Sequence, residues 1–184
     1  MCRASLILPP VLALLLAACV PSLNPLYTSN QLVFDPGLEG TWVEKEGHNT
    51  WVIRKGEDKG YEIRYTEDGV PAGFEGQLVE LGDHLFLDLY PAEPEIRNDF
   101  YKGHLIRAHT FGRIRREGDR MRVAMLDPDW LEPLLARKQV RLEHVRIEDD
   151  IVLAAPTAAL QEFLLKHVTD PKAFSDPVEL IRQK

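Results

Sequence analysis

The stretch YEIRYTEDGVPAGFEGQLVELGDHLFLDLY, residues 61–90, contains three apolar runs separated by two turn signals. The turn signals are Asp68-Gly69 and Gly82-Asp83, and such dipeptides favour tight hairpin connections. In the first run, every second residue from Tyr61 is apolar, as expected of a strand with one buried face. This stretch therefore predicts consecutive antiparallel strands.

The same pattern continues on both sides of this stretch. It predicts strands at 41–45, 50–55, 60–66, 74–81, 84–90, 104–116, 120–126, 140–147 and 151–155. The strand at 84–90 is apolar on both faces, so we expect it to be a central strand that is covered on both sides. Helices are expected after Asp127-Pro128 and after Thr157, with a last helical turn through Val178. The predicted fold class is mainly β (α+β), with an antiparallel meander forming a small barrel or a strongly curved sheet and short C-terminal helices.

The composition is that of one globular domain with an acidic surface. The chain has 184 residues, of which 45% are hydrophobic and 28% charged, and its formal net charge is −7. Proteins that bind nucleic acid are usually basic, so we expect no nucleic-acid partner. A general affinity for anionic lipid surfaces is disfavoured for the same reason.

The first 18 residues have the pattern of a secretory signal peptide. Arg3 supplies a positive charge, Ala4–Leu16 is an apolar run, and Ala17-Ala18 are small residues before Cys19. A transmembrane helix is disfavoured because it needs about 20 apolar residues and because Pro9-Pro10 would disrupt it. Residues 1–18 are therefore predicted to be removed from the mature protein.

The stretch Leu16-Ala17-Ala18-Cys19 resembles the lipobox of bacterial lipoproteins. The resemblance implies that Cys19 becomes the first residue and carries a diacylglycerol, usually with a third chain such as palmitate on the new amino terminus. Two or three acyl chains anchor a protein stably in a membrane. Residue 20 is Val and not Asp, which in enterobacterial lipoproteins implies the outer membrane, here facing the periplasm of the cell envelope. The alternative is a plain signal peptide with an incidental Cys.

Residues 19–36 are predicted to be a lipid-anchored tether, followed by a single β-rich domain at 37–184. Pro21, Asn24-Pro25 and Asp35-Pro36 interrupt any periodicity in this segment. Fully extended, it would reach on the order of 50 Å. Leu26-Tyr27 and residues 32–34 are apolar, so we expect part of the segment to lie against the domain.

Two further resemblances concern the fold and the mature chain. Gly40-Thr41-Trp42 resembles the Gly-x-Trp motif of lipocalin-like barrels, which implies a Trp that begins the first strand and plugs the closed end of the barrel. In that family an Arg packs across the Trp, and no later motif of this chain identifies such an Arg. The stretches LNPLY (23–27) and LDLYP (87–91) are similar to those of bacterial envelope lipoproteins of comparable size, a likeness that implies no activity.

The residues that carry common enzyme chemistry are not arranged for it. Cys19 is the only Cys after processing, and it is the predicted acylation site. No Ser lies in a nucleophile-elbow context, and no Gly-rich loop opens a helix. His104 and His109 are five residues apart, so on a regular strand they would point to opposite faces. We therefore expect no catalytic residue, no metal and no cofactor.

Two non-enzymatic functions remain open, of which the first is favoured, and a hydrolase is the remaining alternative. One is binding of a small apolar or amphipathic ligand in the barrel, with an aromatic loop at 91–103 covering its mouth. Its predicted lining is Trp42, Tyr61, Tyr65, Phe86, Phe100, Tyr101, Met121 and Met125. The other is a scaffold or assembly role through contacts with an envelope protein partner, in which exposed Trp130 or Phe100-Tyr101 would mark the interface.

A cluster of basic residues flanks the Gly118 turn of this acidic chain. Arg113, Arg115 and Arg120 are candidates for contact with an anion or a lipid headgroup, because guanidinium groups bind such anions in a bidentate manner. The alternative is a solvated hairpin tip whose charges pair with Glu117 and Asp119.

Overall fold

The computed structural model describes residues 19–148 and 150–184. The predicted signal peptide, residues 1–18, lies outside the described residues.

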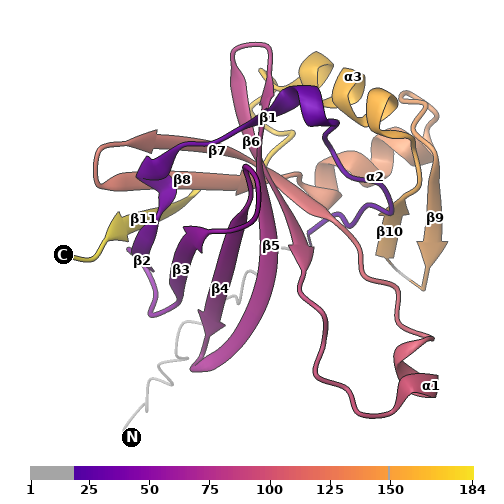
Figure 1. The fold of residues 1–184 in the computed structure, drawn as a ribbon. Coiled ribbons are helices and arrows are strands. Elements are labelled where there is room, and N and C mark those ends of the chain that lie inside the picture. The colour runs from indigo at the N-terminus through magenta and orange to yellow at the C-terminus, as the bar shows by residue number, and fades with distance from the viewer. Residues whose placement is uncertain (1–18, 149) are drawn as a thin grey trace, which may run out of the picture.

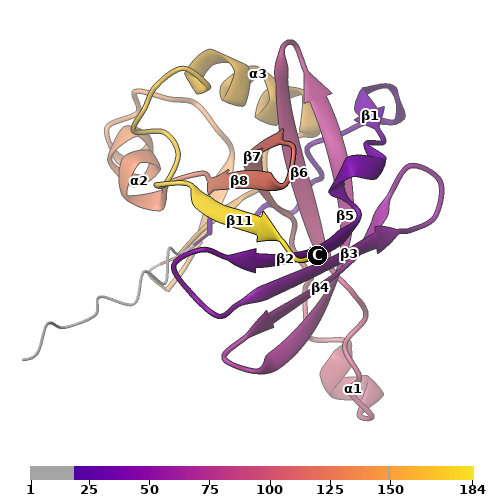
Figure 2. The same cartoon turned by 90° about the vertical axis from the view of Figure 1, so that its left-hand side faces the viewer.

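Eight antiparallel strands form a closed barrel of the lipocalin-like kind (Figures 1 and 2). In sheet order they are β5 (Val70–Leu81), β4 (Tyr61–Glu67), β3 (Thr50–Lys55), β2 (Gly40–Glu44), β11 (Val178–Arg182), β8 (Arg120–Met125), β7 (Thr110–Glu117) and β6 (His84–Pro91). The sheet closes because the long strand β5 pairs with β4 through its first half and with β6 through its second. The turns follow the sequence signals, since Asp68 and Gly69 both adopt positive φ, 49° and 83°, as a tight hairpin requires.

The barrel interior is filled by apolar side chains from every strand. Alternation directs one face of each strand inward, where side chains pack as a single cluster. Its buried members are Leu38, Trp42, Ile53, Tyr61, Ile63, Leu78, Leu87, Leu89, Ile114, Met121, Val123 and Leu180. The interior is therefore a solid core.

Trp42 occupies the place that the Gly-x-Trp resemblance implies. Its side chain is fully buried, and its indole Nε1–H donates to the carbonyl oxygen of Leu38, 2.9 Å away, in the 3₁₀ turn η2 (Pro36–Leu38). The Arg182 guanidinium lies 4.2 Å from the centre of the Trp42 ring and also donates to the carbonyls of Gly37 and Glu39. The Arg that no motif identified is thus Arg182, near the end of the chain.

A second layer covers one side of the barrel (Figure 2). It contains α2 (Pro128–Ala136), α3 (Thr157–His167), the hairpin of β9 (His144–Ile147) and β10 (Asp150–Leu153), and the N-terminal segment. Phe86 and Phe111 point into this layer, whereas Leu87 points into the barrel. The expectation that 84–90 is covered on both faces is confirmed.

The strand that closes the barrel differs from the prediction. Residues 178–182 were expected to form a helical turn after Asp176-Pro177, but they form β11 between β8 and β2. Here Leu180 pairs with Met121 on one side and with Glu44 on the other, so long-range pairing prevails over the local helix-start signal.

Residues 20–36 pack against the domain over most of their length and are not a free tether. Val20 and Leu26 are buried, and β1 (Leu32–Val33) pairs with β5. The Ser22 N–H donates to the His109 carbonyl and the Leu153 N–H to the Pro21 carbonyl, each at 2.8 Å. The prolines interrupt periodicity, but the other residues of the segment supply enough backbone amides and apolar side chains to cover the edge of the sheet.

A long loop leaves the barrel between β6 and β7 and carries the short helix α1 (Asp99–Lys102) at its tip (Figure 1). The Asn98 side chain caps α1 by accepting the Tyr101 N–H at 2.9 Å. The strand expected at 104–116 begins only at Thr110.

Candidate functional site

The structure gathers half of the predicted ligand lining inside the barrel. Trp42, Tyr61 and Met121 are buried members of the interior cluster, and Met125 packs against it. These side chains belong to one apolar cluster, in which Trp42, Tyr61 and Met121 are at most 2% exposed. The predicted lining is therefore part of the packing of the barrel.

The other predicted lining residues lie in three separate places. Tyr65 lies at one end of the barrel beside Trp51, with ring centres 5.1 Å apart. Phe86 lies outside the barrel in the second layer. Phe100 and Tyr101 lie on α1, where they are 81% and 59% exposed, and do not cover the barrel mouth as a lid.

Polar side chains cross the end of the barrel at Tyr65. The Asn49 side-chain amide donates to the Tyr65 hydroxyl at 3.1 Å and to a Glu44 carboxylate oxygen at 3.0 Å. Burial, together with the nearby Glu44 and Glu67 carboxylates, raises the pKa of Tyr65 well above its usual value, so its hydroxyl stays neutral. This network holds the end of the barrel in one arrangement.

A buried carboxylate joins the stretches 23–27 and 87–91. Asp88, of 87–91, is 1% exposed, and its Oδ2 accepts the backbone N–H of Leu26, of 23–27, at 2.7 Å. Its Oδ1 lies 2.8 Å from Nδ1 of His109 at the start of β7. Asp88 therefore ties the N-terminal segment to two neighbouring strands.

A small hollow lies beside this carboxylate on the outer wall of the barrel. It has a volume of about 240 Å³, and Pro25, Tyr27, Glu75, Gln77, Asp88, Tyr90 and His109 line it. The His109 ring packs against Tyr90 with centres 4.5 Å apart, and the Arg107 guanidinium lies 4.6 Å from the centre of the Tyr90 ring. The imidazole is therefore held by ring packing as well as by its contact with Asp88.

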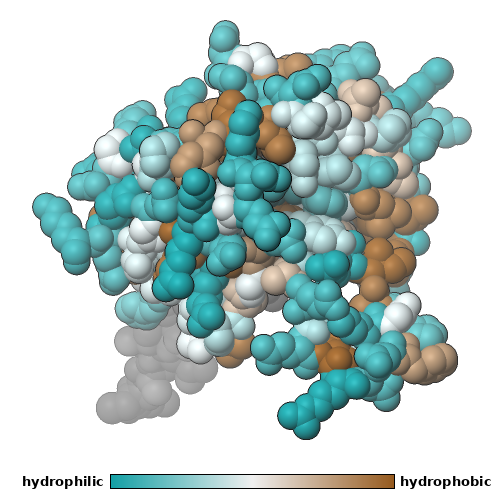
Figure 3. All heavy atoms as spheres, in the orientation of Figure 1, coloured by the Kyte–Doolittle hydropathy of each residue, from teal (hydrophilic) through white to brown (hydrophobic). Residues whose placement is uncertain are grey.

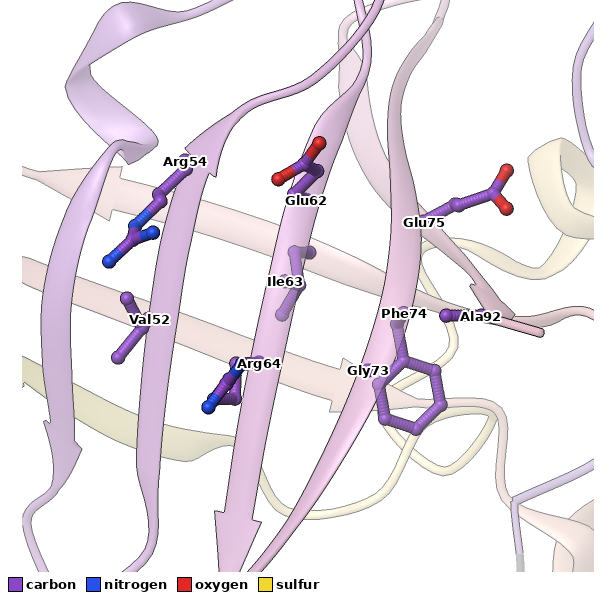
Figure 4. Close-up of a pocket in the computed structure, with 9 residues that line it drawn as sticks. All are labelled: Val52, Arg54, Glu62, Ile63, Arg64, Gly73, Phe74, Glu75 and Ala92. Atoms are coloured by element: carbon purple, nitrogen blue, oxygen red, sulfur yellow. The ribbon is translucent and has the colours of Figure 1, made fainter. Parts of the chain in front are cut away.

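Glu75 also lines two larger grooves on the same wall, of about 600 and 680 Å³. Figure 4 shows the first groove, in which Arg54, Glu62 and Arg64 gather along β3 and β4 while the Glu75 carboxylate points away from them beyond β5. The charged groups in this groove are thus spread along the wall and do not converge on one point.

The Asp88–His109 pair has the orientation that supports a general base, but the neighbouring hydroxyl is not placed as a nucleophile. Ser22 is fully buried, and its Oγ donates to the Asn24 carbonyl at 2.8 Å. Within the described ranges, no group of three or more His, Cys, Asp or Glu side chains is placed to share a metal ion. What the pair does contact is the N-terminal segment, through the hydrogen bond from the Leu26 N–H to Asp88. One sequence signal could have identified Asp88, because it is a charged residue in a strand that is apolar on both faces.

The basic cluster is divided among several partners. Arg113 donates to the Val168 carbonyl at 2.8 Å, and Arg120 lies 3.8 Å from a Glu179 carboxylate oxygen. Asp119, an expected partner of the hairpin tip, instead pairs with Arg182 at 3.3 Å. Arg115 is exposed and lies directly opposite Arg122 in the ladder of β7 and β8.

Apolar side chains reach solvent on the loop of α1 and on β9. Phe100, Tyr101, Leu105 and Ile106 are exposed on the loop, and Val145 and Ile147 on β9. Figure 3 shows brown residues along the side of the molecule where β9 lies, and again at the projecting loop. Trp130, the other predicted interface marker, packs instead against Phe163 and His167 with ring centres 6.1 and 5.1 Å away.

In the part of the chain that the structure describes, no helix is long and apolar enough to cross a membrane. Comparison of the chain with models of protein families, with curated proteins and with solved structures found no match.

Proposed function

We propose that the protein is a lipid-anchored component of the bacterial cell envelope, held in the outer membrane by acyl chains on Cys19 and facing the periplasm. The lipobox resemblance of residues 16–19 supports this anchor. The exposed position of Cys19 is compatible with acylation, and Val20, the next residue, is already 4% exposed. An anchor at Cys19 would hold the barrel close to the bilayer, because the chain enters the folded domain directly after it.

The protein acts, in this proposal, through contacts with another envelope protein and without catalysis. The observation that carries this proposal is where the apolar side chains lie. One set packs inside the barrel, and a separate set is exposed on the loop of α1. Phe100 and Ile106 are each 81% exposed there. Exposed apolar clusters with a polar rim are typical of protein interfaces, and aromatic side chains commonly contribute most of the binding energy.

The loop carries charges of both signs beside its apolar side chains. Its acidic residues are Glu93, Glu95 and Asp99, its basic residues are Arg97, Lys102 and Arg107, and Glu93 is paired with Lys102. Charged groups of both signs around an apolar centre can form the polar rim of a protein interface, which supports a protein partner.

Photo-crosslinking in cells tests the interface. A photoreactive residue replaces Phe100 or Ile106 in separate variants, and a third variant carries it at Val70, which is 71% exposed on the β4–β5 hairpin. We expect both loop positions to form an adduct with the same protein, identified by mass spectrometry, and position 70 to form none with it. Adducts with phospholipid, or with a second copy of the chain, would contradict the proposal.

The anchor has its own test, in which Cys19→Ser is compared with the native chain for membrane fractionation and acyl mass. We expect the variant to lose the acyl mass and to leave the membrane fraction. Retention of both would exclude Cys19 as the anchor.

Native mass spectrometry of the Cys19→Ser chain tests the alternative of a ligand in the barrel. We expect the mass of the polypeptide alone, because Trp42, Tyr61 and Met121 fill the interior. An additional mass that is lost on denaturation would instead favour ligand binding.

A further inference from the structure

The outer face of β7 and β8 brings arginines together against their mutual repulsion. Arg115 lies directly opposite Arg122 in the ladder, and Arg113 lies two residues along the same face of β7. Like charges directly opposite each other in a sheet are destabilising. A bound anion would remove this repulsion.

The Glu179 carboxylate beside this face is already paired with other cations. Glu179 lies opposite Arg122 on β11, but its carboxylate oxygens are 3.1 Å from Lys45 Nζ and 3.8 Å from Arg120. The Lys45 hydrogen bond lowers the pKa of Glu179, and the charges of Lys45, Arg122 and Arg120 add to this effect. Among residues 19–148 and 150–184, no carboxylate forms an ion pair with Arg115 or Arg122.

These side chains surround a hollow of about 190 Å³. Its lining consists of Arg113, Ile114, Arg115, Arg122, Ala124 and Pro177, so that three of its residues are arginines and none is Asp or Glu. Arg113 is fixed in place by its hydrogen bond to the Val168 carbonyl and by the Phe174 ring, whose centre is 5.0 Å from the guanidinium carbon. Pockets for drug-sized ligands usually have about 300 Å³ or more, so this hollow suits a smaller group.

We propose that this hollow binds a phosphate group, either of a free phosphate or pyrophosphate or of a phospholipid headgroup. Guanidinium groups bind phosphate oxygens through paired, charge-assisted hydrogen bonds, and they remain charged at every physiological pH. The proposed site uses Arg122 in place of Arg120, because Arg120 is beside Glu179 and outside the hollow. It does not depend on the lipid anchor or on a partner at α1.

The first arm of the test is calorimetry of the Cys19→Ser chain with inorganic pyrophosphate at low ionic strength. We expect binding that is weakened about tenfold or more in Arg115→Gln/Arg122→Gln. The control, Arg54→Gln/Arg64→Gln, removes the same charge from two exposed arginines on β3 and β4 and should leave binding unchanged. Pyrophosphate should also raise the melting temperature of the parent chain but not of Arg115→Gln/Arg122→Gln, which distinguishes loss of the site from loss of folding.

The second arm separates the two sources of phosphate by co-sedimentation of the same chains with vesicles. Binding to phosphatidylglycerol but not to phosphatidylcholine, lost in Arg115→Gln/Arg122→Gln, identifies a headgroup site. Pyrophosphate binding without vesicle binding identifies a site for a free anion. The proposal is overturned if neither probe binds, or if the arginine variant binds both as well as the parent chain does.

Discussion

The barrel interior and the layer outside it are two cores of the same protein, and they are built differently. The interior is lined by apolar side chains of successive hairpins and closed by Trp42. The outer layer joins the N-terminal segment, α2, α3 and the β9–β10 hairpin, and it contains the buried polar residues Ser22 and Asp88. The side chains inside the barrel are apolar or aromatic, and the hydrogen bonds of this core lie at its ends, at Trp42, Arg182 and Tyr65. The outer layer instead has a buried carboxylate, that of Asp88, which accepts a hydrogen bond from the backbone of a distant segment. Substitutions in the two cores should therefore have different consequences.

The largest effect is expected inside the barrel. Trp42→Ala removes a fully buried indole and the surface on which Arg182 stacks, and it should lower the free energy of unfolding by about 3–5 kcal/mol. Urea denaturation of the Cys19→Ser chain measures the change. Val70→Ala, at an exposed position, is the control and should change stability by less than about 0.5 kcal/mol. A small effect of Trp42→Ala would mean that the interior is not one close-packed core.

Asp88→Ala should have the next largest effect, and it should act on the outer layer. The substitution leaves the buried Leu26 N–H without its acceptor and removes the hydrogen-bond partner of His109 Nδ1, at a cost of about 2–4 kcal/mol. Limited proteolysis should then cut within residues 20–31 while the barrel strands stay protected. The control is Glu62→Ala, at an exposed position on β4. Unchanged protection of the N-terminal segment would show that Asp88 does not hold it.

The same difference explains which contacts of each core could be predicted from the sequence. Alternation and turn dipeptides are local signals, so the strands from 41 to 90 and their order as hairpins were predicted correctly. Strand β11 and the contact of Arg182 with Trp42 were not predicted. Arg182 and Trp42 are 140 residues apart along the chain, so no local pattern indicates that they meet. Asp88 was missed as a site residue because its partners, Leu26 and His109, come from other segments. The prolines of residues 20–36 indicated a break in periodicity, but they carried no information on what those residues pack against.

A smaller effect is expected where α3 contacts the N-terminal segment. The Thr157 hydroxyl, predicted to cap α3, donates instead to the Pro25 carbonyl at 2.8 Å. Thr157→Val keeps the shape and removes the donor, so it should destabilise the protein by about 1 kcal/mol. Thr157→Ser keeps the hydroxyl and should retain most of the stability in the same urea measurement. Equal effects of the two substitutions would assign the role of Thr157 to its methyl group.

The smallest effect is a pH dependence that arises at a histidine of the outer layer. His167 packs between Trp130 and Phe163, with ring centres 5.1 and 4.9 Å away, and its Nε2 is buried without a hydrogen-bond partner among the described residues. Burial and the neighbouring Lys166 lower the pKa of His167 below its ordinary value of 6.5, although Asp170 opposes them.

Because the folded state binds this proton less readily than the unfolded state, the His167 contribution to stability is fully present above pH 6.5. It is lost as the pH falls through the lowered pKa. His167→Gln should therefore flatten the decline in unfolding free energy between about pH 7 and pH 5, a window set by the reference pKa of histidine. In the parent chain, Trp130 fluorescence should change with pH as His167 titrates. In His167→Gln this change should be absent. His144→Gln, on the exposed strand β9, is the matched control and should keep the slope. If His167→Gln also kept it, the acid sensitivity would come from groups other than the histidine of this layer.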